Sequence, residues 1–325
     1  MPKALITGIA GQDGSYLAEL LLSKKYEVYG MVRSRGDVSF ERLAPIRSRI
    51  RVVKADLGDQ KSLDTAVGKI RPDELYNLAA PSFLLASSKD PVFTGEIAGL
   101  GVARLLDSIR RLSPRTRFYQ ASSAEMFGDV RSTPQKETTP LHPRNPYAAA
   151  KAYGHFVTGH FRETHGLFAA SGICFNHESP RRALHFVTRK VTHAAASIKL
   201  GLASRLSVGN LEARRDWGFA GDYVQAMWRM LQADEPEDFV IATGVTHTVE
   251  ELVETAFEEA GLDWKKYVDV DPKFLRPGET ADLLRGDASK ARKKLGWRPQ
   301  VDFKALIRMM VLSDLKLLSG PASSR

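Results

Sequence analysis

The stretch Ala4–Gly14, ALITGIAGQDG, decides the fold. Four strand-forming residues run into a turn with three glycines spaced three apart, and a helical pattern follows. Glycine here permits a tight turn, close backbone approach to a pyrophosphate and close helix packing, and the helix N-terminus then faces the anion. An ordinary tight turn would also use glycine, but the place between first strand and first helix predicts a dinucleotide-binding loop. The residues expected at the cofactor are Gly8, Gly11, Gln12, Asp13 and Gly14.

The first half of the chain alternates short apolar runs with helical patterns, which predicts an α/β fold with a Rossmann-type doubly wound parallel sheet. The runs are largely apolar, as strands covered by helices on both faces should be. We expect strands at residues 4–7, 27–32, 50–55, 75–79, 117–121, 168–175 and 239–243. We expect helices at residues 16–24, 99–112, 146–165, 186–199 and 222–232.

The pattern loosens after Asn176, which predicts a smaller α/β substrate domain interleaved with the first. The expected NADP-binding Rossmann domain covers residues 1–175, with returning segments near 211–245 and 280–295. The expected nucleotide-sugar domain covers residues 176–210, 246–279 and 296–318. Residues 319–325, SGPASSR, are expected to be a flexible tail.

The composition of the 325 residues, 43% hydrophobic and 26% charged, is that of an ordinary globular protein. Cys174 is the single cysteine, so no disulfide can form within the chain, which fits a reducing cytosol. The glycine turn begins too early for a signal peptide, and no apolar run approaches the roughly 20 residues that span a bilayer. We therefore expect a soluble, cytoplasmic protein with no membrane partner.

The net charge of +9 raises the possibility of nucleic-acid binding. However, lysine and arginine are scattered, charges of both signs are mixed, and no basic run carries interleaved aromatic residues. The eight histidines show no metal-ligand spacing. A protein that holds anionic phosphates, with no nucleic-acid partner and no metal, explains the charge better.

The end of the second strand decides between NAD and NADP. An acidic residue there would bind the ribose 2′-hydroxyl of NAD, but this chain has Arg33 and Arg35. Arginine offers a fixed positive charge and a planar set of donors that suit a 2′-phosphate, so NADP is predicted. The pair Asp56 and Leu57 is expected near the adenine. The cofactor cleft is expected to be lined by Leu78, Ala79 and Ala80.

Tyr147 and Lys151 stand four residues apart in a predicted helix, so both project from one face. The lysine charge is expected to lower the pKa of the phenol and make tyrosinate a usable base. Such a pair also occurs by chance on exposed helix faces. Here it follows a strand that ends in Ser122 and Ser123, whose hydroxyls suit a sugar alcohol.

With the glycine loop, these residues resemble the extended short-chain dehydrogenase/reductases. Four further segments resemble the GDP-mannose 4,6-dehydratase family, and the similarity runs from Lys3 to about Leu315. The segments are FYQASSAEMFG at 118–128, FNHESPRR at 175–182, FVTRK at 186–190 and GNLEARRDWG at 209–218.

The resemblance implies a catalytic plan with Ser123, Glu125, Tyr147 and Lys151. Tyr147 would remove the 4-hydroxyl proton as a hydride leaves C4 for NADP⁺, and Glu125 would take the acidified C5 proton. Water then departs from C6 and the hydride returns there, so the cofactor is regenerated. Glu125 discriminates this reaction, because an epimerase or reductase needs no carboxylate at that place. A carboxylate at a helix start would have an ordinary structural explanation.

The resemblance also implies the remaining binding residues. Arginine and lysine there would neutralise the pyrophosphate. A structural salt bridge would explain any one of them, but their joint spacing favours a site. The implied substrate-binding residues are Ser82, Glu125, Asn176, Lys190, Arg215 and Arg276, and His177 and Arg182 are expected beside the cofactor together with Tyr147 and Lys151.

Several positions depart from the family pattern. Ser123 replaces a threonine, Ala124 a serine or aspartate, Pro81 a glutamine, and Ala183 a glycine, while Ser88 stands where many bacterial members have tryptophan. These changes lie near the sugar, so another GDP-sugar such as a GDP-heptose stays open, as does a 4-oxidising epimerase. A catalytically impaired nucleotide-binding homologue is a third possibility, against which the retained catalytic residues argue.

The resemblance finally implies a homodimer, and in some members a homotetramer. The helices at 99–112 and 146–165 would pair across a two-fold axis as a four-helix bundle. The apolar residues proposed for that face are Leu105, Leu106, Phe156 and Phe161.

Overall fold

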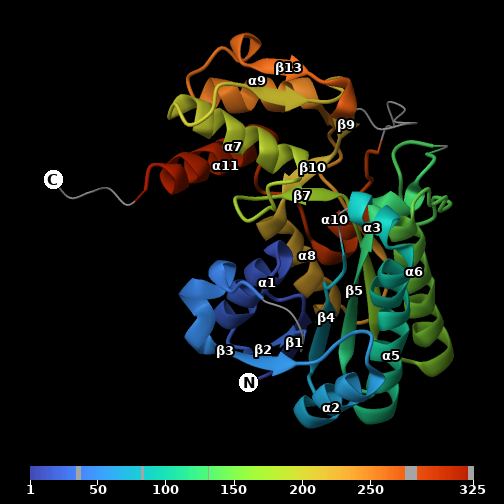
Figure 1. The fold of residues 1–325 in the computed structure, drawn as a ribbon. Coiled ribbons are helices and arrows are strands. Elements are labelled where there is room, and N and C mark those ends of the chain that lie inside the picture. The colour runs from blue at the N-terminus through green and yellow to red at the C-terminus, as the bar shows by residue number, and fades with distance from the viewer. Residues whose placement is uncertain (34–37, 82–83, 131, 275–283, 321–325) are drawn as a thin grey trace.

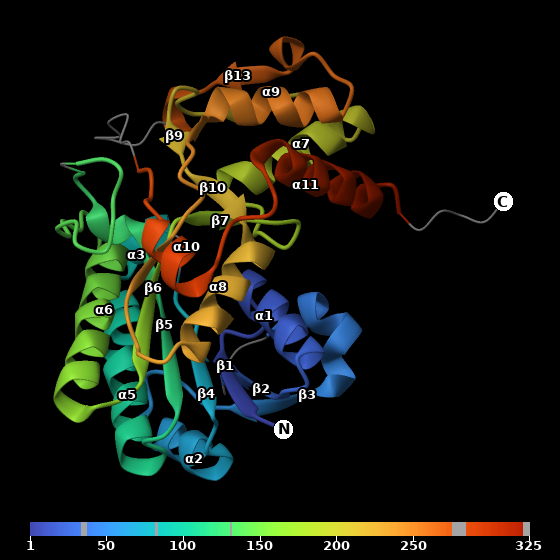
Figure 2. The same ribbon diagram turned by 180° about the vertical axis from the view of Figure 1, so that it is seen from behind.

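The structure, a computed structural model, describes residues 1–33, 38–81, 84–130, 132–274 and 284–320. Arg35, Ser82 and Arg276, which the sequence proposes for the cofactor or substrate, lie outside these residues, as does the tail from 321. Figure 1 shows a unit built on a large sheet and a smaller unit above it, with the N-terminus at the base of the sheet. The turned view in Figure 2 shows the last helix, α11, beside α7 in the smaller unit.

Within the described residues, seven strands form one parallel sheet in the order β11-β6-β5-β4-β1-β2-β3. The order reverses beside β1, which is the doubly wound arrangement that places ligands at the carboxyl ends of the strands. The predicted Rossmann-type fold is confirmed. The strands are β1 (Lys3–Thr7), β2 (Glu27–Val32), β3 (Ile50–Lys54), β4 (Glu74–Asn77), β5 (Arg117–Ser123), β6 (Ala169–Cys174) and β11 (Phe239–Ile241).

Helices cover both faces of the sheet, as Figures 1 and 2 show. Neighbouring residues of one strand enter different cores, because side chains alternate across a sheet. Thus Leu5 packs with one set of helices and Ile6 with the other, and both are fully buried. The first set is α2 (Gln60–Ile70), α5 (Gly101–Leu112) and α6 (Pro146–His165); the second is α1 (Gln12–Ser23) and α8 (Ala220–Gln232), with the short α10 (Ser289–Leu295).

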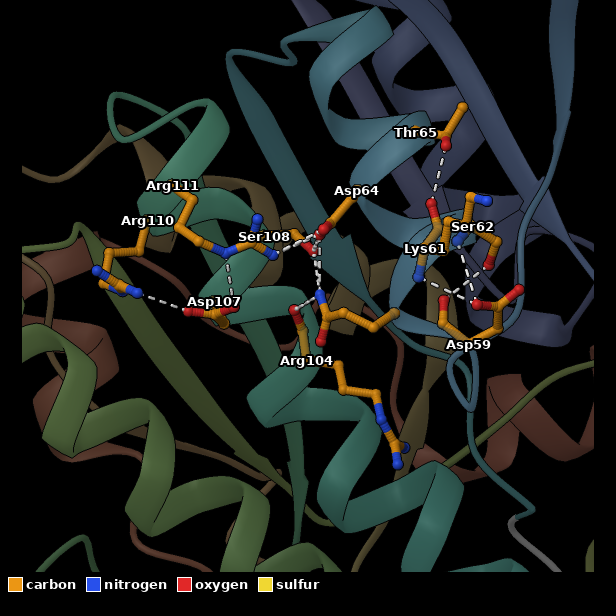
Figure 3. A network of polar contacts seen from close by, with 11 residues as sticks. Asp59, Lys61, Ser62, Asp64, Thr65, Arg104, Asp107, Ser108, Arg110 and Arg111 are labelled. Carbon is orange, nitrogen blue, oxygen red and sulfur yellow. Dashed lines mark hydrogen bonds and ion pairs between the residues drawn. The ribbon is translucent and has the colours of Figure 1, made fainter.

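A polar network fixes α5 against α2 (Figure 3). Asp64 of α2 accepts a hydrogen bond from Ser108 at 2.7 Å and two from the Arg111 guanidinium at 2.7 and 2.8 Å. Arg111 also donates to Asp107 on its own helix at 2.7 Å. These groups are partly exposed, so the pairs contribute modestly to stability but define the orientation of α5. Since α6 packs on α5, the network supports the helix that carries Tyr147.

The remaining short elements connect these layers. They are the 3₁₀ segments η1 (Glu41–Arg49) and η3 (Ala124–Phe127), the helices α3 (Leu84–Lys89) and α4 (Pro91–Gly95), and the π-helical turn η2 (Glu96–Leu100).

The smaller unit packs three helices around its own core. Trp217 is almost fully buried there and stacks on Phe303 with ring centroids 6.0 Å apart. The helices are α7 (Val187–Lys199), α9 (Val249–Glu259) and α11 (Phe303–Leu318). Short strand pairs complete it: β7 (Asn176–Glu178) with β10 (Trp217–Phe219), β9 (Arg214–Arg215) with β12 (His247–Thr248), and β8 (Leu206–Val208) with β13 (Val268–Val270), besides the 3₁₀ turns η4 (Trp264–Lys266) and η5 (Pro272–Phe274).

The predicted elements agree with the observed ones to within a few residues, with two informative differences. The first helix begins at Gln12 rather than Tyr16, because Gly11 is its N-cap and the last glycine of the loop lies in its first turn. The helix expected from 99 to 112 begins as α5 at Gly101, after a π-helical turn. Among the described residues, no helix is both long and apolar enough to cross a membrane.

Candidate functional site

The glycine loop has the backbone geometry that the sequence predicts. Gly8 has φ of +68°, and a Cβ there would lie 3.0 Å from the backbone of Ala79 at the end of β4. A Cβ at Gly14 would lie 2.4 Å from the Gly8 carbonyl oxygen, so only glycine lets α1 approach β1 so closely. Gly11 caps α1 without any side-chain acceptor, whereas α2 and α6 are capped by Asp59 and Asn145. The first turn of α1 thus presents uncapped N–H groups, which fit a pyrophosphate.

A buried polar latch, which the sequence analysis missed, joins the strand ends beneath this loop. The Thr7 hydroxyl donates to Asn77 Oδ1 at 2.7 Å and accepts from the backbone N–H of Leu78 and of Ala79, both at 3.0 Å. Asn77 Nδ2 in turn donates to Gln120 Oε1 of β5 at 2.8 Å. Polar residues at the ends of apolar strands were the available signal. The latch places Leu78, Ala79 and Ala80, all half-buried, beside the glycine loop.

Asp13, Gln12 and His177 meet although 164 residues separate Asp13 from His177. The Asp13 carboxylate lies 2.8 Å from His177 Nε2, and His177 Nδ1 donates to the Phe175 carbonyl at 2.7 Å. Gln12 donates to the His177 carbonyl at 3.0 Å and accepts from the Ser179 hydroxyl at 2.8 Å. These contacts connect the first turn of α1 to the segment after β6.

Asp13 and His177 form an ion pair. Burial alone would raise the pKa of Asp13, but His177 and the hydrogen bonds around the carboxylate lower it to about 2. Burial alone would lower the pKa of His177, but Asp13 and the Phe175 carbonyl raise it above its ordinary value. Asp13 is therefore a carboxylate that orients His177, and His177 stacks on Tyr223 with ring centroids 4.7 Å apart.

Arg182 is held on the same segment. Its Nε lies 3.0 Å from the buried Glu178 carboxylate, and its guanidinium lies 3.5 Å from the centroid of the Phe186 ring. Thr188 also donates to Glu178, at 2.5 Å. Arg182 acts electrostatically on Asp13, His177 and Tyr147, so its charge influences residues of both α1 and α6.

Ser123 and Glu125 lie at the carboxyl end of β5. The Ser123 hydroxyl accepts from the Glu125 N–H at 3.2 Å and so caps the 3₁₀ turn η3. This contact needs only the hydroxyl, so serine serves where the family pattern has threonine. Ala124 is almost fully buried in a cluster with Phe127 and Phe175, so its methyl group faces the core.

Tyr147 and Lys151 project from α6 toward the same strand. Lys151 is buried and donates to the Ala121 carbonyl at 2.7 Å, while its Nζ lies 5.7 Å from the centroid of the Tyr147 ring. The Ser123 hydroxyl is hydrogen-bonded to Tyr147, and Glu125 is near enough to act on the phenol electrostatically. The structure therefore brings all four predicted catalytic residues together.

The predicted lowering of the phenol pKa by Lys151 is wrong for this structure. Burial raises the pKa of Tyr147 well above its ordinary value, Glu125 raises it further, and Ser123 and Arg182 only partly oppose this. Burial also lowers the pKa of Lys151 to about 8. Removing the phenolate from water destabilises it by more free energy than one nearby ammonium ion restores. In this state Tyr147 is a protonated phenol.

The predicted substrate residues come from the smaller unit and its connections. Asn176 of β7 pairs in register with Trp217 of β10, two residues after Arg215. Arg215 is half-buried on β9 and donates to the Arg214 carbonyl at 2.6 Å. Lys190 of α7 donates to the Ser207 carbonyl at 2.6 Å, and its Nζ lies 3.8 Å from the centroid of the Phe274 ring.

The residues predicted for the adenine half of the cofactor differ in how their positions suit binding. Arg33 is exposed at the end of β2. Asp56 is bound to its own turn, where it accepts from the Gly58 N–H at 2.9 Å. The Leu57 side chain is buried in the core beside Gly101, so only its backbone can reach a ligand. Arg42 of η1, which the sequence analysis missed, donates to the Ala10 carbonyl of the glycine loop at 3.4 Å and to the Arg181 carbonyl at 2.8 Å.

Metal ligation has no support in the part of the chain that the structure describes, where no group of three His, Cys, Asp or Glu side chains could hold an ion. His177 Nε2 faces Asp13 and its Nδ1 faces a carbonyl, so both ring nitrogens are engaged.

The parallel sheet, the glycine loop and the Ser–Tyr–Lys constellation define the chain as an extended short-chain dehydrogenase/reductase by class. Residues 5–310 match the model of the GDP-mannose 4,6 dehydratase family. The chain belongs to that family.

Curated relatives agree with this assignment over nearly their whole lengths. The chain is 51% identical to GDP-mannose 4,6 dehydratase 2 of Arabidopsis thaliana, over 97% of this chain and 87% of the relative. It is 46% identical to GDP-mannose 4,6 dehydratase of Homo sapiens, over 97% and 92%. It is 44% identical to GDP-mannose 4,6-dehydratase of Vibrio cholerae, over 97% and 94%.

Solved structures share the fold. A UDP-glucose 4-epimerase of Thermus thermophilus, in complex with NAD, superposes with a TM-score of 0.84 at 27% identity, covering 96% of this chain and 98% of that one. A dTDP-glucose 4,6-dehydratase from Streptomyces venezuelae, with NAD bound, has a TM-score of 0.83 at 25% identity and covers 96% of each.

Proposed function

We propose that this chain is a GDP-mannose 4,6-dehydratase, which converts GDP-mannose to GDP-4-keto-6-deoxymannose. The observation that carries the proposal is the turn at the end of β5, where Ser123 caps the backbone of Glu125 beside Tyr147. The Tyr147 phenol and the Glu125 carboxylate can then carry out two different proton transfers on one sugar. The curated dehydratases that share 44–51% of its residues support the same reaction.

Each residue has one task in this proposal. A bound nicotinamide would supply a hydride acceptor for C4 and, in its reduced form, a hydride donor for C6. Tyr147 takes the 4-hydroxyl proton in its tyrosinate form, Ser123 orients that hydroxyl, and Lys151 holds the helix to the Ala121 carbonyl. Glu125 takes the C5 proton once C4 is a ketone and gives it to the C6 hydroxyl, which leaves as water. Tyr147 returns its proton to C5 as C6 receives the hydride. The net change is loss of water with no net redox change.

The substitution Glu125→Gln tests the proposal. It keeps the size of the side chain and the Ser123 cap, which uses the backbone N–H. We expect water loss to fall by about two to four orders of magnitude, because a positioned base contributes that much. Mass detection of GDP-4-keto-6-deoxymannose measures it, and calorimetry with NADP(H) should show nearly unchanged binding. Full turnover by the variant would place the base elsewhere and weaken the assignment.

We propose NADP(H) as the nicotinamide cofactor. Gly8, Gly11 and Gly14 make the phosphate loop, and Gln12, Asp13, His177 and Arg182 form its wall. Exposed Arg33 supplies a cation at the end of β2, and Arg42 supplies another beside Ala10. Arg35 belongs to the same proposal from the sequence. Equal or tighter binding of NAD(H) in calorimetry would contradict it.

We propose Lys190 and Arg215 as cations for the GDP diphosphate and Asn176 as a sugar or phosphate contact. The Lys190 ammonium donates to a carbonyl and lies over an aromatic ring, and the Asp271 carboxylate acts on it electrostatically without a salt bridge among the described residues. From the sequence, Ser82 and Arg276 complete this set.

We also propose the division into a Rossmann domain of residues 1–175 with its returning segments and a nucleotide-sugar domain. We propose a cytoplasmic location as well.

We propose that two copies associate through α4, η2 and α6. Leu105 and Leu106, which the sequence suggested for this contact, are fully buried within the chain, and Phe161 packs partly against the same core. The outer face instead exposes Val92 at 75% and Phe156 at 64%. A hollow of about 290 Å³ opens between α6 on one side and α4 with η2 on the other, and Leu100 and Tyr153 line it.

A second copy suits this face because a dimer would cover an apolar surface that continues across neighbouring helices. A monomer mass in light scattering at micromolar concentration would refute the dimer. The substitution Phe156→Glu should convert a dimer to monomer without changing the fold.

A further inference from the structure

His155 lies on the face of α6 that carries Tyr147 and Lys151. The three residues are spaced four apart, so they occupy successive turns on one side of the helix. His155 Nδ1 lies 3.1 Å from the Ser122 hydroxyl oxygen, and the His155 side chain is only 11% exposed. Ser122 is buried, so it does not meet substrate.

Three successive turns of α6 therefore meet three successive residues of β5. Tyr147 meets the Ser123 hydroxyl, Lys151 meets the Ala121 carbonyl, and His155 meets the Ser122 hydroxyl. The first contact joins proposed catalytic groups. The other two fix the register of the helix against the strand. Of these two, the histidine contact has no part in the proposed chemistry.

The far side of the ring faces a carboxylate that is itself held in place. His155 Nε2 lies 3.9 Å from Asp238, just before β11. The Arg162 guanidinium donates to both carboxylate oxygens of Asp238, at 2.9 and 3.0 Å, and the Ser171 N–H donates to it at 3.1 Å. Arg162 also donates to the Ala169 carbonyl of β6 at 2.9 Å. Asp238 thus ties α6 to β6 and β11.

The charges favour one tautomer. Burial and the Arg162 charge lower the pKa of His155, and Asp238 opposes them, so the ring is neutral near pH 7. A carboxylate opposite Nε2 favours the proton there, which leaves Nδ1 to accept from the Ser122 hydroxyl. Asp238 and Arg162 are the charged groups that face the ring.

We propose that His155, oriented by Asp238, is a positioning residue that holds Ser122, and through it Ser123, in place against Tyr147. The inference rests on the proposed roles of Ser123 and Tyr147. Because the Ser123 hydroxyl favours the tyrosinate, loss of the His155 contact weakens that bond and raises the pH at which Tyr147 acts as a base.

Three substitutions at two positions test it. His155→Leu keeps a comparable volume and removes the acceptor, and His155→Asn keeps an acceptor near the Nδ1 position. Ser122→Ala removes the other partner with little change of volume. The matched control is His160→Leu, because exposed His160 on the same helix makes a similar contact, 3.2 Å from Thr164 Oγ1.

We expect His155→Leu to lower kcat about tenfold with KM within about twofold, since small misplacements of reacting groups cost rate. The pH of half-maximal kcat should rise by about one unit. Ser122→Ala should do the same, and the double variant should be no worse than either single one. His155→Asn should recover most of kcat, and His160→Leu should change neither quantity. An unchanged kcat and pH profile in His155→Leu would overturn the proposal, as would a lower melting temperature without a pH shift or rescue.

The titration of Tyr147 gives a readout that does not depend on turnover. In protein with ring-labelled tyrosine and bound NADP(H), the signal that Tyr147→Phe removes is followed by NMR against pH. His155→Leu and Ser122→Ala should both raise the pKa of that signal. No shift would reject the positioning role, whereas a shift in a protein that does not dehydrate GDP-mannose would reject the proposed reaction alone.

Discussion

The cofactor side and the substrate side of the site hold their charges in opposite ways. Around the glycine loop, Asp13 pairs with His177 and Arg182 with Glu178, so charge is largely neutralised within the protein. On the substrate side, Lys190 lies against the Ser207 carbonyl and the Phe274 ring, and Asp271 acts on it electrostatically but forms no salt bridge with it among the described residues. In the proposed function, the first arrangement stabilises the fold around a dinucleotide, and the second keeps a positive charge for a diphosphate. Substitutions on the two sides should therefore have different consequences.

The largest effect is expected where the two sides meet, at Tyr147. Tyr147→Phe removes the acid–base group but keeps the ring, so kcat should fall by about 10²- to 10⁴-fold. Affinity for NADP(H) and GDP should stay within a few-fold, because neither charge arrangement is touched. Stopped-flow absorbance of NADPH with GDP-mannose measures the first hydride transfer. Retained hydride transfer would show that another group takes the 4-hydroxyl proton.

The next effect concerns the substrate side alone. Lys190→Met removes the cation over Phe274 and should weaken GDP binding by about ten- to hundredfold, as loss of a charged hydrogen bond does. Calorimetry with GDP measures it. The control is Lys199→Met at the exposed end of the same helix, which should bind GDP normally. Weakened NADP(H) binding in Lys190→Met would contradict the prediction that the two sides bind their ligands independently.

The cofactor side should respond in stability and with a defined pH dependence. His177→Asn keeps a donor toward the Phe175 carbonyl but removes the partner of Asp13, which should lower the free energy of unfolding by about 1–3 kcal/mol. The folded pKa of His177 is raised, so its contribution is complete below 6.5 and is lost as pH rises through the folded value. The folded pKa of Asp13 is lowered, so its contribution is complete above 3.8 and is lost as pH falls toward about 2.

The gap in stability between wild type and His177→Asn should therefore be widest from about pH 4 to 6.5. Urea unfolding at pH 5.5 and pH 8.5 measures it. A gap that is constant across this range would show that the pair contributes through packing and not through charge.

The smallest effect is expected at the sugar. Pro81 stands where the family pattern has glutamine, so a sugar hydroxyl loses an amide partner, and Pro81→Gln should raise dehydration of GDP-mannose about fivefold. GDP should bind nearly as well as GDP-mannose to the wild type. Comparison of kcat/KM for GDP-mannose and a GDP-heptose in both proteins measures this. If the substitution lowers activity on GDP-mannose, the proline belongs to a pocket for a different sugar.

The sequence by itself determined the sheet, the glycine loop and the placing of Tyr147 and Lys151 on one helix face. Apolar strand runs, glycines and a four-residue helical spacing are local patterns, and local chain geometry decides them. The bounds of β2 and α6 followed from such patterns. The grouping of Ser123 and Glu125 with Tyr147 and Lys151 was implied by the resemblance to a family, and the structure brings the four together.

Tertiary structure alone decided the contacts between residues far apart in the chain and the electrostatics of the site. The Asp13–His177 pair, the Thr7–Asn77–Gln120 latch and the His155–Ser122 contact each join separate segments, which no local spacing encodes. Burial also reversed the expected pKa of Tyr147, because desolvation depends on everything that surrounds a group and not on its neighbour along the helix. Leu105 and Leu106 face the core for the same reason: an apolar helix residue does not specify which surface it will cover, and the packing of α5 against the sheet settled it.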